Sequence, residues 1–236
     1  IRRVLTEIHP NVRKQFLMNY MVNSGIYGLP YIKKMKEEHQ CNVPWAILMD
    51  PTAACNLKCT GCWAAEYNKA DSMSYELLDR IINEGKALGI YMYIYSGGEP
   101  LVRKDDIIKL CEKHDDCMFL AFTNATLVDE KFSKEMTRVG NLLLAISVEG
   151  FEEETDMRRG KGTYQKVMKA MDILREDGNG FGFSTCYHSK NTDVVGSEEY
   201  VDLMMEKGCL FGWYFTYMPL GKDAVPELWV SPEQRE

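Results

Sequence analysis

The sequence lacks the long apolar run of a membrane-spanning helix, and it lacks an excess of positive charge. No stretch approaches the roughly 20 apolar residues that a membrane span needs. Lysine and arginine together number 28 and aspartate and glutamate 35, which gives a net charge of −7. Because phosphate contacts require clustered lysine and arginine, this balance argues against nucleic acid or an anionic membrane as a partner.

Histidine is also scarce, and the cysteines form no disulfide pattern. The 236 residues include four dispersed histidines and eight cysteines. A chain of this length and cysteine distribution does not resemble a small disulfide-stapled domain. No secretory signal is visible at the N-terminus, but the first residue is Ile1 and not Met, so we expect the start of the protein to be missing. No low-complexity segment occurs. These absences favour a reducing cytoplasm, with five cysteines as small buried side chains: Cys41, Cys111, Cys117, Cys186 and Cys209.

The other three cysteines, Cys55, Cys59 and Cys62, have the spacing Cys-x3-Cys-x2-Cys. Three thiolates on one short loop can hold three corners of an iron–sulfur cube, which leaves the fourth iron open to a ligand that is not protein. The alternative is tetrahedral zinc, with His188 or Cys186 as the fourth ligand. We favour the cluster, because structural zinc sites usually pair two knuckles and the sequence has no second one.

From residue 45 onward, strand and helix patterns alternate, which predicts a parallel sheet with right-handed crossovers. Ser74, Thr163 and Ser197 are the expected N-caps, and glycines follow the predicted helices. Strands are expected over 45–49, 91–95, 117–122, 142–148, 181–187 and 210–217. Helices are expected over 75–88, 105–113, 130–138, 164–176 and 198–207.

The chain is divided into an N-terminal helical segment, residues 1–44, and a core domain, residues 45–236. In the first segment we expect a helix over 10–23, a break at Ser24-Gly25 and a second helix over 30–40. This segment packs on the rim of the core or forms a surface for a partner or membrane interface, and its amphipathicity does not decide. Ser231 and Gln234 form a capping box just before the chain ends, so we expect truncation at the C-terminus.

The order of strand 45–49, cysteine loop, helix, strand 91–95 and Ser96-Gly-Gly-Glu-Pro100 resembles the radical S-adenosylmethionine (SAM) superfamily. The resemblance covers about residues 45–221. It implies an α/β fold, a six-stranded (β/α)6 partial TIM barrel. It also implies that Cys55, Cys59 and Cys62 bind a [4Fe–4S] cluster and that SAM chelates the open iron. Reductive cleavage of SAM would yield a 5′-deoxyadenosyl radical that abstracts hydrogen from a substrate.

The resemblance also assigns SAM contacts at later strand ends. The turn at 97–100 would receive the amino group, and Arg159, or its neighbour Arg158, would pair with the carboxylate. This chain departs from the family pattern at Ala125 and at Glu149, where glycine and aspartate are usual. The segment Tyr217–Gly221 resembles an adenine-contact segment. The expected SAM-binding residues are Gly97, Gly98, Glu99, Pro100, Asn124, Ser147, Glu149, Arg159 and Trp63.

Trp63 is included because many relatives have an aromatic residue just before the third cysteine, where this chain has Gly61. Trp63 either compensates for this or packs in the core. The pattern most resembles the branch with SPASM or twitch C-terminal extensions, which implies a peptide or protein maturase or a cofactor-biosynthesis enzyme. A flavodoxin or ferredoxin would be the reductant. The alternatives are a lipid-modifying relative and a non-enzymatic iron–sulfur sensor. No catalytic residue is identified.

Overall fold

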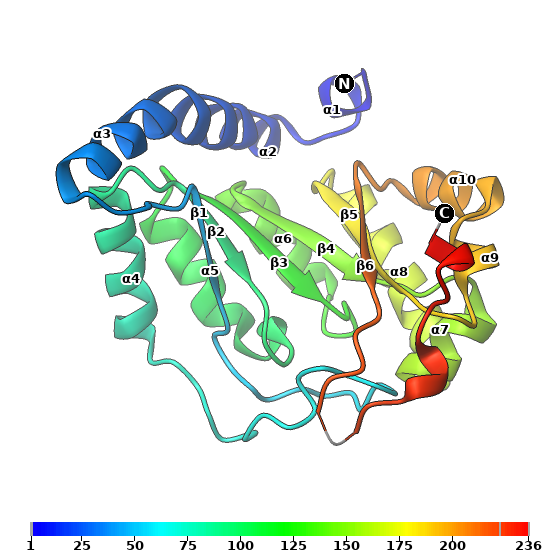
Figure 1. Ribbon diagram of the computed structural model, residues 1–236. Coiled ribbons are helices and arrows are strands. Elements are labelled where there is room, and N and C mark those ends of the chain that lie inside the picture. The colour runs from blue at the N-terminus through cyan, green and yellow to red at the C-terminus, as the bar shows by residue number, and fades with distance from the viewer. Residues whose placement is uncertain (1, 222, 236) are drawn as a thin grey trace.

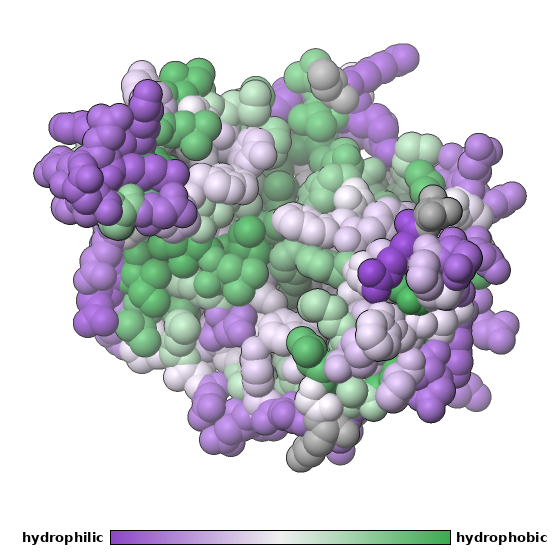
Figure 2. Space-filling model, in the orientation of Figure 1, coloured by the Kyte–Doolittle hydropathy of each residue, from purple (hydrophilic) through white to green (hydrophobic). Residues whose placement is uncertain are grey.

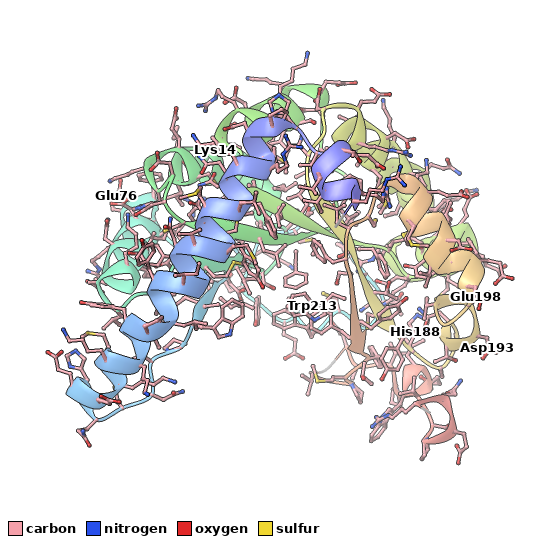
Figure 3. All side chains as sticks on the ribbon, turned by 90° about the horizontal axis from the view of Figure 1, so that it is seen from above. Lys14, Glu76, His188, Asp193, Glu198 and Trp213 are labelled. Carbon is pink, nitrogen blue, oxygen red and sulfur yellow. The ribbon has the colours of Figure 1, made fainter. Side chains whose placement is uncertain are left out.

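The computed structural model describes residues 2–221 and 223–235, and its centre is a sheet of six parallel strands (Figure 1). The strands lie side by side in chain order. The sheet curls into a half-barrel, which Figure 3 shows from above. This architecture confirms the predicted six-stranded partial barrel. The strands are β1 (Ala46–Met49), β2 (Met92–Tyr95), β3 (Met118–Thr123), β4 (Leu142–Ser147), β5 (Phe181–Tyr187) and β6 (Gly212–Thr216).

Helices cover the convex face of the half-barrel and bury the main core against it. Tyr93, Phe119 and Leu144 from the sheet are fully buried in one cluster with Ile82 and Met171 from helices. Among the described residues, no helix has the length and hydrophobicity needed to cross a bilayer. The elements are α4 (Tyr75–Ala87), η2 (Pro100–Arg103), α5 (Lys104–Lys113), α6 (Glu130–Val139), α7 (Glu152–Arg159), α8 (Thr163–Glu176), α9 (Thr192–Val195), α10 (Glu198–Lys207), η3 (Pro226–Leu228) and η4 (Glu233–Arg235).

The concave face of the sheet changes from apolar to polar toward the carboxyl ends of its strands. A small cluster of Met92, Met118 and Leu120 packs there against Phe16 from the N-terminal helices. Farther along, Ser147 pairs with Ser184, and Ser184 pairs with Trp213. Figure 3 shows Trp213 on the inner side of the arch. Ser147 and Ser184 therefore lie in the same row of the sheet as Trp213.

Residues 10–39 form one continuous helical segment, so the predicted break at Ser24-Gly25 is wrong. A π-helix runs through both residues. Ser24 is buried, and a Cβ on Gly28 would lie 2.6 Å from the Gly89 carbonyl oxygen. Gly28 therefore serves a close contact with the loop before β2, and Ser24 and Gly25 do not end the helix. The segment comprises α2 (Pro10–Gln15), η1 (Phe16–Gly28) and α3 (Leu29–His39), and α1 (Arg2–Thr6) precedes it.

Two of the three predicted N-caps are confirmed. The Ser74 and Ser197 hydroxyls accept hydrogen bonds from backbone N–H groups in the first turns of α4 and α10. The prediction for Thr163 is wrong, because Gly162 is the N-cap of α8. The side chain of Asp156, on α7, accepts hydrogen bonds from the Gly162 and Tyr164 N–H groups. The cap is thus supplied by a neighbouring helix.

The sequence prediction also missed α7, the eight-residue helix that carries both arginines of the candidate site. Its first turn holds three consecutive glutamates, and the Glu154 carboxylate accepts a hydrogen bond from the Phe151 N–H. Both features are typical of a helix N-terminus.

Among the scattered cysteines, Cys41 is exposed, which contradicts its expected burial, and Cys186 is only partly buried.

We predict that Gly28→Ala and Gly25→Ala have opposite effects on stability. At Gly28 the new methyl group would press on the Gly89 carbonyl, so the free energy of unfolding should fall by about 1–3 kcal/mol. At Gly25 the nearest atom would be 3.6 Å away, which is ordinary contact. Alanine there should be neutral or add up to about 1 kcal/mol through helix propensity. Urea unfolding measures both, and equal effects would contradict the close-contact role of Gly28.

Candidate functional site

The cysteine loop, residues 50–73, lies between β1 and α4 at the carboxyl edge of the sheet. An isolated bridge between Thr52 and Ser72 closes its base. Hydrogen bonds from the Ala53 N–H to the Asp71 carbonyl (2.9 Å) and from the Met73 N–H to the Pro51 carbonyl (3.1 Å) reinforce it. All three loop cysteines are free thiols of intermediate exposure. The loop therefore presents its thiols from a fixed base.

The two glycines after β2 allow the next turn to pack directly on this loop. Gly97 has φ +98°, and a Cβ on Gly98 would lie 2.2 Å from the Ala54 carbonyl oxygen. The Gly98 N–H donates to the Thr52 carbonyl at 2.9 Å, and the Glu99 N–H donates to the Ala54 carbonyl at 2.8 Å. These two N–H groups are already bonded, so carbonyl oxygens are the groups of this turn that suit a ligand amino group.

Glu99 is almost fully buried and joins the β2 turn to the end of β3. Its carboxylate accepts hydrogen bonds from the Leu101 N–H (2.9 Å), the Thr123 hydroxyl (2.6 Å) and the Asn124 N–H (2.7 Å). Burial raises the pKa of Glu99, and these donors oppose that rise. Pro100 is buried at the start of η2. Within the protein, then, Glu99 holds two strand ends together.

Asn124 connects the end of β3 to the cysteine loop. Its side-chain amide donates at 2.9 Å to the side-chain oxygen of Asn56, which lies between the first two cysteines. The next residue, Ala125, has φ +56°. This left-handed conformation is strained for alanine and would be unstrained for glycine. The turn after β3 therefore adopts this conformation although alanine does not favour it.

At the end of β4, Glu149 is fully buried between two arginines. Arg158 donates to Glu149 Oε1 at 2.7 Å, and Arg159 lies 2.5 Å from the same oxygen. The other oxygen accepts the Cys186 N–H at 2.9 Å. Burial alone would raise the pKa of Glu149, but the two guanidinium groups outweigh it and lower the pKa. The carboxylate is therefore charged at neutral pH.

The same arginines reach the cysteine loop. Arg159 Nη1 lies 3.9 Å from the Cys59 sulfur, and the Arg158 carbonyl accepts the Thr60 N–H at 2.8 Å. Burial raises the pKa of Cys59, while the Arg159 and Arg158 charges oppose that rise. Arg158 Nε is buried without an acceptor among the described residues. A buried unpaired donor of this kind suits an anionic or oxygen-rich ligand.

Tyr217 lies against the cysteine loop at Gly61, the residue before the third cysteine. A Cβ on Gly61 would lie 2.6 Å from the Tyr217 hydroxyl oxygen. The tyrosine, which follows β6, is almost fully buried, and its hydroxyl accepts the Val225 N–H at 2.9 Å. Trp63 is 46% exposed and contacts Tyr67 edge-on, so it does not pack in the core. Gly61 was the sequence signal for this arrangement.

The described residues contain no ready-made site for a single metal ion. Within residues 2–221 and 223–235, no three His, Cys, Asp or Glu side chains are placed to hold one ion together. Tetrahedral zinc would need Cys55, Cys59 and Cys62 and either His188 or Cys186 at one centre. In an iron–sulfur cluster each thiolate would bind a different iron. The preference for a cluster over zinc therefore rests on the spacing of the three cysteines.

Comparisons with known proteins show what the chain is similar to. A family model described as the radical SAM superfamily matches residues 49–204. An uncharacterised protein of Archaeoglobus fulgidus is 35% identical over 53% of this chain and 31% of its own length. AdoMet-dependent heme synthase of Methanosarcina barkeri is 28% identical over 83% of this chain and 56% of its own. Streptococcus suis SuiB, bound to precursor peptide SuiA, shares 18% identity with a TM-score of 0.68, covering 80% and 43%.

We predict that Glu149→Gln lowers the free energy of unfolding by about 3–5 kcal/mol at pH 7, because it leaves two arginines without their buried counter-charge. The pKa of Glu149 is lowered from its usual 4.5, so its stabilising effect is complete above that pH and is lost as the pH falls further. The wild-type protein should lose this contribution on acidification, while the variant should lack that part of the pH dependence.

Urea unfolding between pH 3 and pH 7 (roughly the range over which carboxylates titrate) measures this effect. Glu153→Gln, on the exposed side of the same helix, removes the same charge and is the matched control. It should change the free energy of unfolding by no more than about 0.5 kcal/mol. Similar losses in the two variants would show that Glu149 has no special role.

Proposed function

The chain belongs to the radical SAM superfamily, and from this we propose that it is a SAM-dependent radical enzyme. One observation carries the proposal: residues of the segments that follow β3 and β4 both contact the cysteine loop. Asn124 reaches Asn56, and Arg159 reaches Cys59. A redox sensor that held only a cluster would need the thiolates. It would not need such a set of polar groups around the iron that has no protein ligand. The chain matches 31% and 37% of the length of the first two curated relatives. The activity of the whole protein is therefore part of this proposal.

In this proposal Cys55, Cys59 and Cys62 hold three irons of a [4Fe–4S] cluster, and SAM binds the fourth. When bound, the cluster and SAM supply a 5′-deoxyadenosyl radical that abstracts hydrogen from the substrate. The protein contributes position, charge and exclusion of water. Carbonyl groups of the turn at 97–98 receive the SAM amino group. Polar groups at Asn124 and Ser147 and the rings of Trp63 and Tyr217 provide the remaining contacts.

Arg159 is our candidate for the SAM carboxylate. It is the more exposed of the two arginines, at 12% against 6% for the Arg158 side chain, and it approaches the Cys59 sulfur. Arg158 is the competing candidate, because its Nε has no acceptor among the described residues. Glu149 holds both guanidinium groups, so we assign it a positioning role for this contact and not a direct bond to SAM.

The concave face supports a substrate with an apolar or aromatic part. Phe122 contacts Trp213 and Phe215 edge-on, and the last two stack at 5.7 Å while each is about 40% exposed. Such rings suit a hydrophobic peptide side chain or a planar small molecule. A peptide maturase or a cofactor-biosynthesis enzyme fits this surface. A flavodoxin or ferredoxin in the reducing cytoplasm would be the electron donor.

We predict that the anaerobically reconstituted protein binds about four irons at the cysteine loop. Replacing Cys55, Cys59 and Cys62 together by alanine should remove the iron and the brown colour, because no thiolate is left to hold a corner. Iron analysis and the visible spectrum measure the outcome. The control replaces Cys111, Cys117 and Cys209 by serine, which leaves the loop intact. A loop variant that retains its chromophore, or a wild-type protein that binds zinc tightly instead, would refute the cluster assignment.

We predict that the reconstituted and reduced protein cleaves SAM to 5′-deoxyadenosine and methionine even without substrate, slowly. Cleavage needs an electron and a bound sulfonium, and any available hydrogen atom can complete it. Chromatography of anaerobic dithionite reactions measures both products. The Cys59→Ala variant should be silent and serves as the control.

The absence of SAM cleavage would refute the proposed chemistry. If protein with a full cluster gives no 5′-deoxyadenosine above the Cys59→Ala background, SAM cleavage is not its chemistry. The iron–sulfur sensor then becomes the better explanation of the cysteine loop.

A further inference from the structure

The N-terminal helical segment turns its polar side chains toward the protein. Asn11 donates to the Thr137 and Arg138 carbonyls at 2.9 and 2.8 Å, at the end of α6. Asn19 donates to the Asp115 and Cys117 carbonyls, and Asn23 donates to the Asp116 carbonyl, all at 2.8–3.0 Å. These bonds satisfy backbone groups that precede β3 and β4. The segment is thus docked on the barrel through these amides as well as through a few buried apolar side chains.

The outward side of the same segment is apolar. Val12, Ile32 and Met35 are buried against the protein, but most of the apolar side chains of this segment face outward instead. Fold stability does not require these exposed side chains, and contiguous apolar surface of this kind usually marks an interaction site. We call this set the outer apolar face: Leu17, Met18, Tyr20, Met21, Ile26, Tyr27, Leu29 and Tyr31, which are 37–66% exposed.

Basic residues lie at both ends of the outer apolar face. Arg13 and Lys14 precede it, and Lys33, Lys34 and Lys36 follow. Residues 2–39 carry seven lysines and arginines against three acidic residues, while the remaining residues carry 21 against 32. The acidic net charge of the whole chain therefore conceals a basic segment, and the argument against an anionic membrane does not apply to it. Figure 2 shows the hydrophilic end of α3 beside green, hydrophobic residues.

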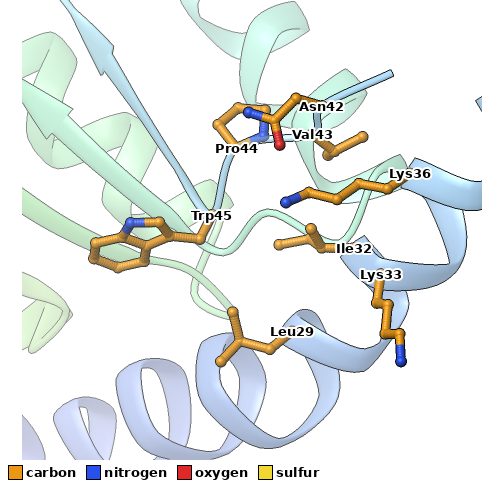
Figure 4. Close-up of a pocket in the computed structure, with 8 residues that line it drawn as sticks. All are labelled: Leu29, Ile32, Lys33, Lys36, Asn42, Val43, Pro44 and Trp45. Carbon is orange, nitrogen blue, oxygen red and sulfur yellow. The ribbon is translucent and has the colours of Figure 1, made fainter. Parts of the chain in front are cut away.

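A cavity of about 360 Å³ adjoins this face, between α3 and the start of β1 (Figure 4). Its apolar wall includes Leu29, Ile32 and Trp45, and Trp45 is 49% exposed. In Figure 4 Lys36 points over the cavity and Lys33 points away from it. An apolar wall below an ammonium group suits an amphiphile with an anionic head, and tryptophan is favoured where apolar and wet regions meet.

We propose that the outer apolar face binds peripherally to an anionic phospholipid bilayer. Apolar and aromatic side chains on one side of a helix, combined with nearby lysines, are typical of interfacial membrane helices. The lysines supply attraction to anionic headgroups. The face lies beside the segments that precede the strands, whereas the cysteine loop lies at their carboxyl ends (Figure 1). Membrane docking therefore leaves the mouth of the candidate site open to water.

Co-sedimentation with lipid vesicles tests the proposal directly. The chain of residues 1–236 should sediment with vesicles of phosphatidylcholine and phosphatidylglycerol, and much less with phosphatidylcholine alone. Raising the salt concentration should weaken binding, because exposed charges are screened. Replacing Lys33, Lys34 and Lys36 by glutamine should lower the partition coefficient by about fivefold for each lysine that approaches the surface.

A second variant tests the apolar contribution. Met21→Glu, Ile26→Glu and Tyr27→Glu together should abolish sedimentation with anionic vesicles without unfolding the protein, because all three side chains are at least 52% exposed. The matched control is Val201→Glu with Met205→Glu on α10, another exposed apolar pair. This control should bind as the wild type does. Circular dichroism verifies that each variant is folded.

Several outcomes would overturn the proposal. One is equal binding to neutral and anionic vesicles, and another is binding that the triple glutamate variant retains. A third comes from sedimentation velocity without lipid. If the chain is a dimer that the triple glutamate variant dissociates, while no variant affects vesicle binding, a second copy of the chain covers this face instead.

Discussion

The buried ion pair of Glu149 with Arg158 and Arg159 is the interaction on which the candidate site depends. It fixes α7 to the end of β4, and through the Cys186 N–H it also fixes the end of β5. Removing three charged groups from water is costly, and only close contacts with additional hydrogen bonds offset that cost. The same arginines touch the cysteine loop at Cys59 and Thr60. One buried carboxylate therefore aligns the loop with the strands below it.

The two ends of the half-barrel have different roles. At the carboxyl ends, polar side chains after β2, β3 and β4 converge on one loop, as is usual for ligand sites in barrels of parallel strands. At the amino ends, three asparagines of the N-terminal helices satisfy backbone carbonyls before the strands. This use of amides leaves the apolar side of those helices facing outward. The fold thereby separates a site for chemistry from a surface for docking.

Sequence patterns predicted secondary-structure elements more reliably than they predicted which residues contact one another. All six strands and the five longer helices after β1 were anticipated within about two residues, because hydrophobic periodicity and caps are local signals. The break at Ser24-Gly25 was wrong, since a π-helix continues through both residues. The glycine that follows, Gly28, serves a contact with Gly89, 61 positions away. The cap at Thr163 was wrong because Asp156 of another helix supplies it. Helix α7 was missed because it is short and strongly acidic at its start.

The sequence by itself determined the cysteine spacing, the strand–helix alternation and hence the superfamily, because each is a pattern within a short stretch. Tertiary structure alone decided which groups meet. Asn56 meets Asn124 across 68 positions, and the Arg159 side chain meets Cys59 across 100. The aromatic ring beside Gly61 comes from Tyr217, at the far end of the barrel sequence. Such contacts depend on how the sheet curls and packs, and a local pattern carries no information about that curvature.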